Sequence, residues 1–405
     1  MEDQSSDTSD EVGPQIRHLG DLVIQAFRNL KHIYESQQGT NGEARLTQAT
    51  VTARASPKEI HYDRLHSSLL PLLKELLTTI TNLLFPGTLR MEAESRFRKV
   101  LELLPELDFQ VSQVDSAVRM ICPGTLSLES QTDDHDLKQF KRFRLIGLKE
   151  MSGQLLSEIC VFLHSASEYV ETMDLSSGGL FEEYDDENNP QAESDQAFYT
   201  ADRMIKHLNR SELDVAEGCW AGALDALDEL FKNTFSIVTP NAPETSPLRR
   251  KLVRQPVIQL TQLTLPIIKL IKLFFKKLSK DGMNHKRRLK LPSFTQMNSH
   301  QLDSLSKSAG KIAVELNEIV LLLTQADLAI AEWHRIHFQS IIKIAERLPT
   351  HFEPALLSVV LYLIPLVAPP SDQKYYQTWF VTWNILINTA LHNFRRLARS
   401  LNEEQ

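Results

Sequence analysis

Apolar residues recur along most of this chain at alternating steps of three and four, the spacing that places side chains on one face of an α-helix. The longest such run lies between Leu302 and Leu348, and neither glycine nor proline interrupts it from Lys311 onward. A stripe this long must be buried against other helices, so the run predicts one helix of roughly 70 Å. Its apolar positions are Leu302, Leu305, Ala309, Ile312, Leu316, Ile319, Leu323, Ala326, Ile330, Trp333 and His337.

The same spacing predicts helices in most other segments, and runs of period two that would indicate strands are absent. Pro71 is expected to kink or split the second helix, and Ser211 to interrupt the helical pattern after residue 209. The sequence therefore predicts an all-α fold. The further helices are expected near residues 14–33, 60–85, 88–121, 133–173, 196–209, 213–238, 253–279, 354–366 and 371–401.

The clearest boundary in the chain is the stretch 176–197, which is rich in Asp and Glu and contains no Lys or Arg. Self-repulsion and the lack of apolar groups indicate a solvated linker between two up-down bundles. The expected organisation is a disordered acidic tail (1–12), an N-terminal bundle (13–175), the acidic linker (176–197) and a C-terminal bundle (198–402).

Composition limits the class of protein. The chain has 405 residues, 42% of them hydrophobic and 24% charged, which is typical of a globular protein with real cores. The acidic N-terminus has no apolar stretch of the kind found in a secretory signal, and the longest apolar run, 355–368, is short and contains Pro365. We therefore expect a cytoplasmic or nuclear protein with no transmembrane segment. Three cysteines in helical patterns, Cys122, Cys160 and Cys219, are expected to be reduced and buried.

Two groups of residues could carry chemistry. His334 and His337 lie one helical turn apart near Glu332, but two histidines from one helix are half a zinc site, and no matching pair occurs on another helix. Asp133, Asp134 and Asp136 resemble the Asp-rich magnesium motif of helical terpenoid synthases, but the second motif is missing, so helix capping is the preferred interpretation. Nucleotide-binding and hydrolase motifs are also absent. We expect no catalytic, cofactor-binding or metal-binding residues.

The distribution of charge along the chain says more about function than these two groups do. Between Arg249 and Lys290 thirteen Lys and Arg face one acid, Asp281, a local net charge of +12 in a chain of net charge −8, so the rest sums to −20. Three functional interpretations compete: a docking face for an acidic partner, a membrane or nucleic-acid surface, and a nuclear import signal at residues 286–290. The alternative is a solvated face neutralised by the protein's own acidic linker. Nucleic acid is not favoured, because aromatic residues do not interleave with the basic ones.

The candidate partner-binding residues follow from this distribution. They form a basic face consisting of Lys269, Lys272, Lys276, Lys280, Lys286, Arg287, Arg288 and Lys290. The candidate acidic linker residues are Glu182, Glu183, Asp185, Asp186 and Glu187.

Several segments of the second half occur in the order typical of one known family. The acidic insert FEEYDDENNPQAESD, the helices QPVIQLTQLTLPIIKLIKLFFKKLSKDG and QLDSLSKSAGKIAVELNEIV, and the closing TWFVTWNILINTALHNFRRLARSL resemble the C-terminal half of the cyclin-D-interacting protein family. The segment KQFKRFRLIGLKEMSGQLLSEICVFLHSASEYV also resembles an uncharacterised, expanded family of rust fungi. The first resemblance implies a vinculin-like pair of bundles and a non-enzymatic role in nucleus and cytoplasm, related to cell-cycle control. It assigns no individual binding residue.

The sequence thus favours an intracellular helical protein that binds regulatory protein partners of unknown identity. Two alternatives remain open. One is a helical enzyme with a pocket between the bundles. The other is a peripheral membrane module that uses the basic helix.

Overall fold

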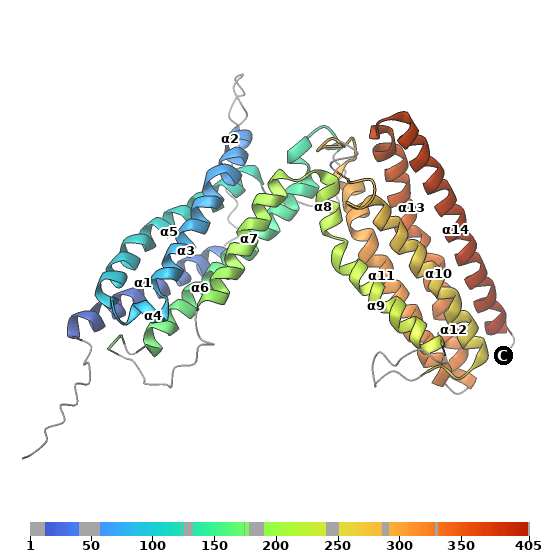
Figure 1. Cartoon of the computed structure of the whole chain (residues 1–405), viewed down its shortest axis with the longest axis horizontal. Helices are drawn as coiled ribbons and strands as arrows, with labels where there is room; N and C mark the ends of the chain where they lie inside the picture. The colour runs from blue at the N-terminus through green and yellow to red at the C-terminus, as the bar shows by residue number, and fades with distance from the viewer. Residues whose placement is uncertain are drawn as a thin grey trace, which may run out of the picture. The chain divides into compact units, whose positions relative to one another are not determined.

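The described part of the chain consists of helices and turns and contains no β-strand, which confirms the all-α prediction (Figure 1). The structure is a computed structural model. It describes residues 13–39, 57–122, 124, 133–173, 175–177, 190–239, 251–285, 291–328 and 331–403. The predicted tail 1–12 lies outside the described residues, as do the linker residues 178–189.

The chain divides into two compact units. Unit 1 comprises Met1–Ser127 and Arg144–Asn209, and unit 2 comprises Leu128–Phe143 and Arg210–Gln405. The division at residue 209 differs from the predicted bundle boundary at 198. Residues 191–209 form one helix of unit 1 because their apolar face is buried there, with Ala197, Ala201 and Met204 fully enclosed.

In unit 1, α5 contacts α1, α2 and α3, and α7 packs on α3. Ion pairs also join helices of this unit. Lys74 on α3 pairs with Asp202 on α7 at 2.5 Å, and Arg28 on α1 pairs with Glu171 on α6 at 2.6 Å. Its helices are α1 (Pro14–Gly39), α2 (Pro57–Arg64), the π-turn η1 (Leu65–Leu69), α3 (Leu70–Leu83), α4 (Pro86–Leu89), α5 (Ala93–Ile121), α6 (Arg142–Thr172, its first two residues in unit 2) and α7 (Gln191–Asn209).

In unit 2, α10 contacts α9, α11 and α14, while α11 also contacts α12 and α13. Ser211 caps α8 in a capping box with Asp214, which confirms the predicted interruption after residue 209. Its helices are η2 (Lys138–Phe140), α8 (Glu212–Gly218), α9 (Ala221–Val238), α10 (Gln255–Leu278), α11 (Ser299–Leu328), α12 (Ala331–Arg347), α13 (Pro349–Ser358), the turns η4 (Val359–Leu363) and η5 (Ile364–Leu366), and α14 (Pro370–Glu403).

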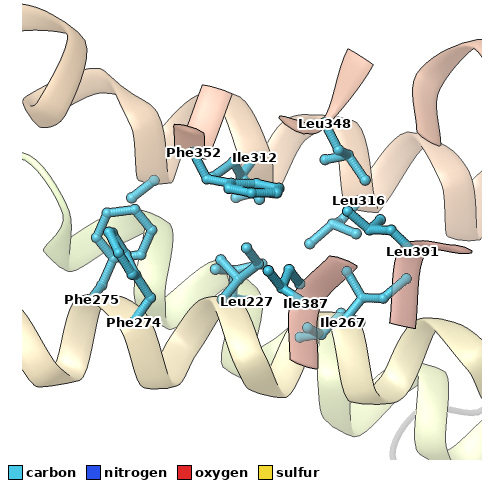
Figure 2. Packing of buried hydrophobic residues seen from close by; sticks show 14 of the residues in the cluster. Leu227, Ile267, Phe274, Phe275, Ile312, Leu316, Leu348, Phe352, Ile387 and Leu391 are labelled. Atoms are coloured by element: carbon cyan, nitrogen blue, oxygen red, sulfur yellow. The ribbon is translucent and has the colours of Figure 1, made fainter. Parts of the chain in front are cut away.

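The core of unit 2 is made by the apolar stripes that the sequence predicted. Figure 2 shows Phe274 of α10, Phe352 of α13 and Ile387 of α14 among the side chains that fill the space between the helices. Each of these three is at most 1% exposed. Trp383 joins α10 and α14, because its indole nitrogen donates to the Leu270 carbonyl at 2.7 Å and its ring lies 4.6 Å from that of Phe274.

The predicted single helix from Leu302 to Leu348 is wrong. The segment forms two helices, α11 and α12, which pack against each other, so the chain reverses between them. The buried positions explain the difference. The α11 stripe runs to Ala326, whereas α12 buries Phe338, Ile341 and Ala345 rather than continuing the stripe through His337, which is only half-buried. The stripe therefore changes phase between the two helices.

Residues 133–143, which we call the strap, belong to unit 2 and include the first two residues of α6, whose remainder belongs to unit 1. The strap is fixed by an ion pair between Lys141 and Glu212 at 2.7 Å, in which both side chains are 0% exposed. Lys141 also donates to the Thr295 carbonyl at 2.7 Å. Glu212 accepts from the Thr295 amide and hydroxyl at 2.8 and 2.7 Å. Both buried charges are thus compensated by partners that lie far apart in the sequence.

Asp134 fixes the other end of the strap. Its carboxylate accepts hydrogen bonds from the Arg142 amide at the start of α6 and from the Ser299 amide and hydroxyl at the start of α11. Burial by itself would raise the pKa of Asp134, but these hydrogen bonds outweigh it and hold the pKa below its ordinary value. The predicted capping role is therefore confirmed for Asp134. Asp133 and Asp136 instead contact His135 at 2.7 and 3.0 Å.

The three cysteines carry reduced thiols, and two of them are buried as expected. Burial raises the pKa of the Cys122 thiol to about 12 and that of Cys160 to about 11. Cys219 is exposed, so the prediction of burial is wrong for this residue. It lies at the C-terminal end of α8, outside the apolar stripe of that helix.

Candidate interaction surface

The basic face predicted from the sequence lies mainly on α10, whose buried stripe faces the core of unit 2. Pro256 sits in the first turn, where its missing N–H costs no helical hydrogen bond. Lys269, Lys276 and Lys280 are exposed, as the predicted basic face requires. Four other predicted basic residues, Lys286, Arg287, Arg288 and Lys290, lie outside the described residues, as do the five acidic linker residues between 182 and 187.

Part of the basic face is used within unit 2. Lys272 is half-buried and pairs with Asp228 on α9. Its burial, together with the charge of Lys276, lowers the pKa of the Lys272 ammonium. Lys269 lies over the ring of Phe231 on α9, 4.9 Å from its centre. The sequence left open whether the basic face is neutralised within the protein, and Asp228 of α9 neutralises Lys272 in this way.

A third lysine, Lys277, joins α10 to α14. Its ammonium donates to the Tyr375 hydroxyl at 2.7 Å and lies 4.6 Å from the Tyr375 ring and 5.2 Å from the Trp379 ring. Cation–π contacts of this kind hold the charge against aromatic rings. Together with the Trp383–Leu270 hydrogen bond, this contact shows that α10 and α14 run antiparallel, the end of α10 lying beside the start of α14.

The outer face of α14 was missed by the sequence reasoning. From Tyr375 to Leu391 the helix carries no charged residue over 17 positions. Its buried stripe accounts for only part of this composition, because Val381, Ile385 and Leu386 are 61%, 61% and 50% exposed. Leu273 on the neighbouring α10 is 51% exposed. The helix thus turns large apolar side chains toward solvent, where a surface helix normally carries polar ones.

Basic residues lie at both ends of this apolar stretch. Lys276, Lys280 and Lys374 lie at the end where α10 finishes and α14 begins, and His392 and Arg396 are exposed at the other end. We call these five residues, with Leu273, Val381, Ile385 and Leu386, the α10–α14 face. The uncharged run within an otherwise amphipathic helix was the sequence signal that could have revealed it.

A further exposed apolar set lies on α13 and η4, where Leu357, Val360 and Leu361 face outward. The segment expected as a helix at 354–366 is therefore buried on one side only. Within the described residues, two stretches, Gln255–Leu278 and Arg335–Leu366, are long and apolar enough to cross a membrane by length and composition alone. The buried residues of both belong to the core of unit 2, a pattern also found in the core helices of soluble proteins.

A buried carboxylate of unit 2 joins neighbouring helices. Glu315 on α11 contacts His351 at 2.8 Å and also pairs with Arg347, which joins three helices. Within the described residues, no group of three His, Cys, Asp or Glu side chains is placed to hold a metal ion. The His334 side chain lies outside the described set, and His337 is half-buried on α12.

Two family profiles match the chain. Residues 58–210 match a domain of unknown function (DUF8723), and residues 211–396 match another domain of unknown function (DUF8721). The border between the two matches lies one residue from the division between units 1 and 2. No curated protein and no solved structure matches the chain. The resemblances to cyclin-D-interacting and rust-fungal proteins, and the vinculin-like arrangement, therefore stay predictions.

Proposed function

We propose that this chain is a non-enzymatic interaction protein of the cytosol or nucleus that binds a protein partner through the α10–α14 face. One observation carries the proposal: the uncharged outer face of α14, where Val381 and Ile385 are each 61% exposed. Exposed apolar groups bordered by polar residues are typical of binding surfaces, because leaving them in water costs free energy that a partner recovers.

The contacts of the ionisable groups support the non-enzymatic part of this proposal. Lys141 and Glu212 compensate each other inside unit 2, and Glu315, Arg347 and His351 join three helices. These groups stabilise packing instead of converging on an open site of the kind that catalysis requires. The resemblance described above adds cell-cycle regulators to the partners to be tested first.

The test is quantitative affinity purification of the full chain from its own cells. The variant Val381→Asp/Ile385→Asp places two charges on the outer face of α14, where they remain solvated and the buried stripe is untouched. Val314→Asp/Leu321→Asp on α11 is the matched control, because Val314 and Leu321 are also exposed, at 67% and 53%. The tryptophan emission and helical circular dichroism of both variants establish that they fold.

The expected result is that a defined set of proteins copurifies with the wild type and with the α11 control and is lost with the α14 variant. Equal recovery with all three proteins would refute the role of the face. Turnover of a small molecule by the purified chain would refute the non-enzymatic role.

A further inference from the structure

The charges around the α10–α14 face point to the chemistry of its partner. Residues 255–280, which include α10, and residues 373–402 of α14 contain no Asp or Glu. They contain nine basic residues: Lys269, Lys272, Lys276, Lys277, Lys280, Lys374, Arg395, Arg396 and Arg399. The charged residues of these two segments are thus all basic, although the net charge of the chain is −8.

We propose that the α10–α14 face binds an acidic amphipathic helix, whose apolar side chains cover Val381, Ile385 and Leu386 and whose carboxylates pair with the basic residues at both ends. This inference rests on the proposed function and specifies its partner. Helices that lay an apolar face on such a surface do so with anchors at i, i+3, i+4 and i+7.

The length of the uncharged stretch fits one partner helix. The 17 residues from Tyr375 to Leu391 span roughly 25 Å at 1.5 Å per residue. Lys276 and Lys374 lie at one end of this stretch, and Arg396 lies past the other. A helix of about five turns can therefore bury its apolar stripe on α14 while its two ends reach basic side chains.

The basic side chains at the ends are available for this pairing. Among the described residues no carboxylate pairs with Lys276, Lys374 or Arg396, and all three are exposed. Lys272 and Arg399 are different, because they pair with Asp228 and with Glu346. The partner is expected to contact the first group, where complementary charge raises the association rate and fixes orientation.

Charge also argues against a second copy of the chain as the occupant. An antiparallel pair of α14 helices would bring the Lys374 end of one copy against the Arg396 end of the other. Within these two helices no acid between residues 373 and 402 would compensate them. Such a pairing places like charges together, which costs free energy.

The experiment begins with a displayed library of randomised 20-residue peptides selected on the full chain. Enriched peptides are expected to combine helical apolar spacing with Asp and Glu at their ends. Their affinity for the chain should fall at least about tenfold with Val381→Asp/Ile385→Asp. It should also fall with Lys276→Glu/Lys374→Glu and with rising salt. Val314→Asp/Leu321→Asp and Lys311→Glu, on exposed α11 positions, should leave it unchanged.

A charge exchange separates direct pairing from an indirect effect of the substitutions. A selected peptide whose terminal Glu residues are changed to Lys should lose binding to the wild type and regain it with Lys276→Glu/Lys374→Glu. A merely structural effect of the lysine substitutions would not restore binding to the altered peptide.

Other outcomes overturn the proposal. Selected peptides without acidic residues, or peptides insensitive to the face variants, contradict it while leaving the proposed function in place if cellular partners still require the face. Cosedimentation with phosphatidylserine vesicles that depends on Val381 and Ile385, without peptide binding, identifies a lipid surface instead. A dimer in sedimentation velocity that Val381→Asp/Ile385→Asp dissolves identifies a second copy. If no cellular partner depends on the face, the proposed function fails as well.

Discussion

Replacing Lys141 with methionine should lower the free energy of unfolding of unit 2 substantially. The position of Lys141, just before α6, does not suggest such an effect. The change leaves Glu212 fully buried with only the Thr295 amide and hydroxyl as donors. Removing one member of a buried ion pair costs about 3–5 kcal/mol, because the other charge remains uncompensated. Methionine fills a similar volume, so little of this loss comes from a cavity.

The assay is urea unfolding followed by tryptophan emission. All four tryptophans, at positions 220, 333, 379 and 383, lie in unit 2, so the emission reports this unit alone. With an m value of about 2–3 kcal/mol per M, the midpoint should fall by roughly 1–2 M. Lys307→Met is the matched control. Lys307 pairs with Asp303 on the surface of α11, where such pairs contribute at most about 1 kcal/mol.

A second substitution tests the reason for the loss. In Lys141→Met/Glu212→Gln the remaining partner is neutral and its amide oxygen can still accept from Thr295, so most of the stability should return. If Lys141→Met alone costs less than about 1 kcal/mol, or if the double variant is as unstable as the single one, the buried pair does not hold the strap as described.

Three further predictions concern other parts of the fold. A chain that stops before Asn384 loses four large buried side chains, Ile387, Leu391, Phe394 and Leu401. Because their burial stabilises the fold by about 6–12 kcal/mol, the truncated chain should be insoluble. Soluble material that unfolds cooperatively would contradict this. Because the pKa of Asp134 is lowered in the folded state, its contribution is full above the ordinary value of 3.8 and is lost as the pH falls through the folded value. The difference in unfolding free energy between wild type and Asp134→Asn should therefore shrink between pH 6 and pH 3, and a constant difference would be evidence against this. Gly20→Ala drives a methyl group into the Leu175 carbonyl and should lower the melting temperature of unit 1 measured by circular dichroism, whereas Gly153→Ala, which meets no atom within 4 Å, should not.

The sequence predicted those features of the fold that depend on local pattern. The buried stripes of α10 and α14 follow directly from their three–four spacing, and Pro71 marks the place where the π-turn η1 gives way to α3. The reversal between α11 and α12 was not predictable in this way. No glycine or proline marks it, and the phase change of the stripe is visible only once the buried residues of α12 are known.

The strap and the α10–α14 face were missed for a different reason. The strap depends on contacts between segments far apart in the sequence, such as Lys141 with Glu212, and the pairing of α10 with α14 depends on contacts such as Lys277 with Tyr375. The exposed side of α14 left one signal in the sequence, the uncharged run 375–391. The charge count found the lysines of α10 correctly, but it could not show that Lys272 is paired with Asp228. The predicted basic face also lacked the exposed apolar residues of α14, which our proposal adds to it.

The most direct test of the account is the reactivity of individual lysines toward an amine-specific reagent, measured by mass spectrometry in the free chain and in its complex with the copurified partner. Lys276 and Lys374 should become protected in the complex, while the exposed Lys311 on α11 keeps its reactivity. Unchanged reactivity of Lys276 and Lys374, with protection elsewhere on the chain, would show that partners bind a different surface.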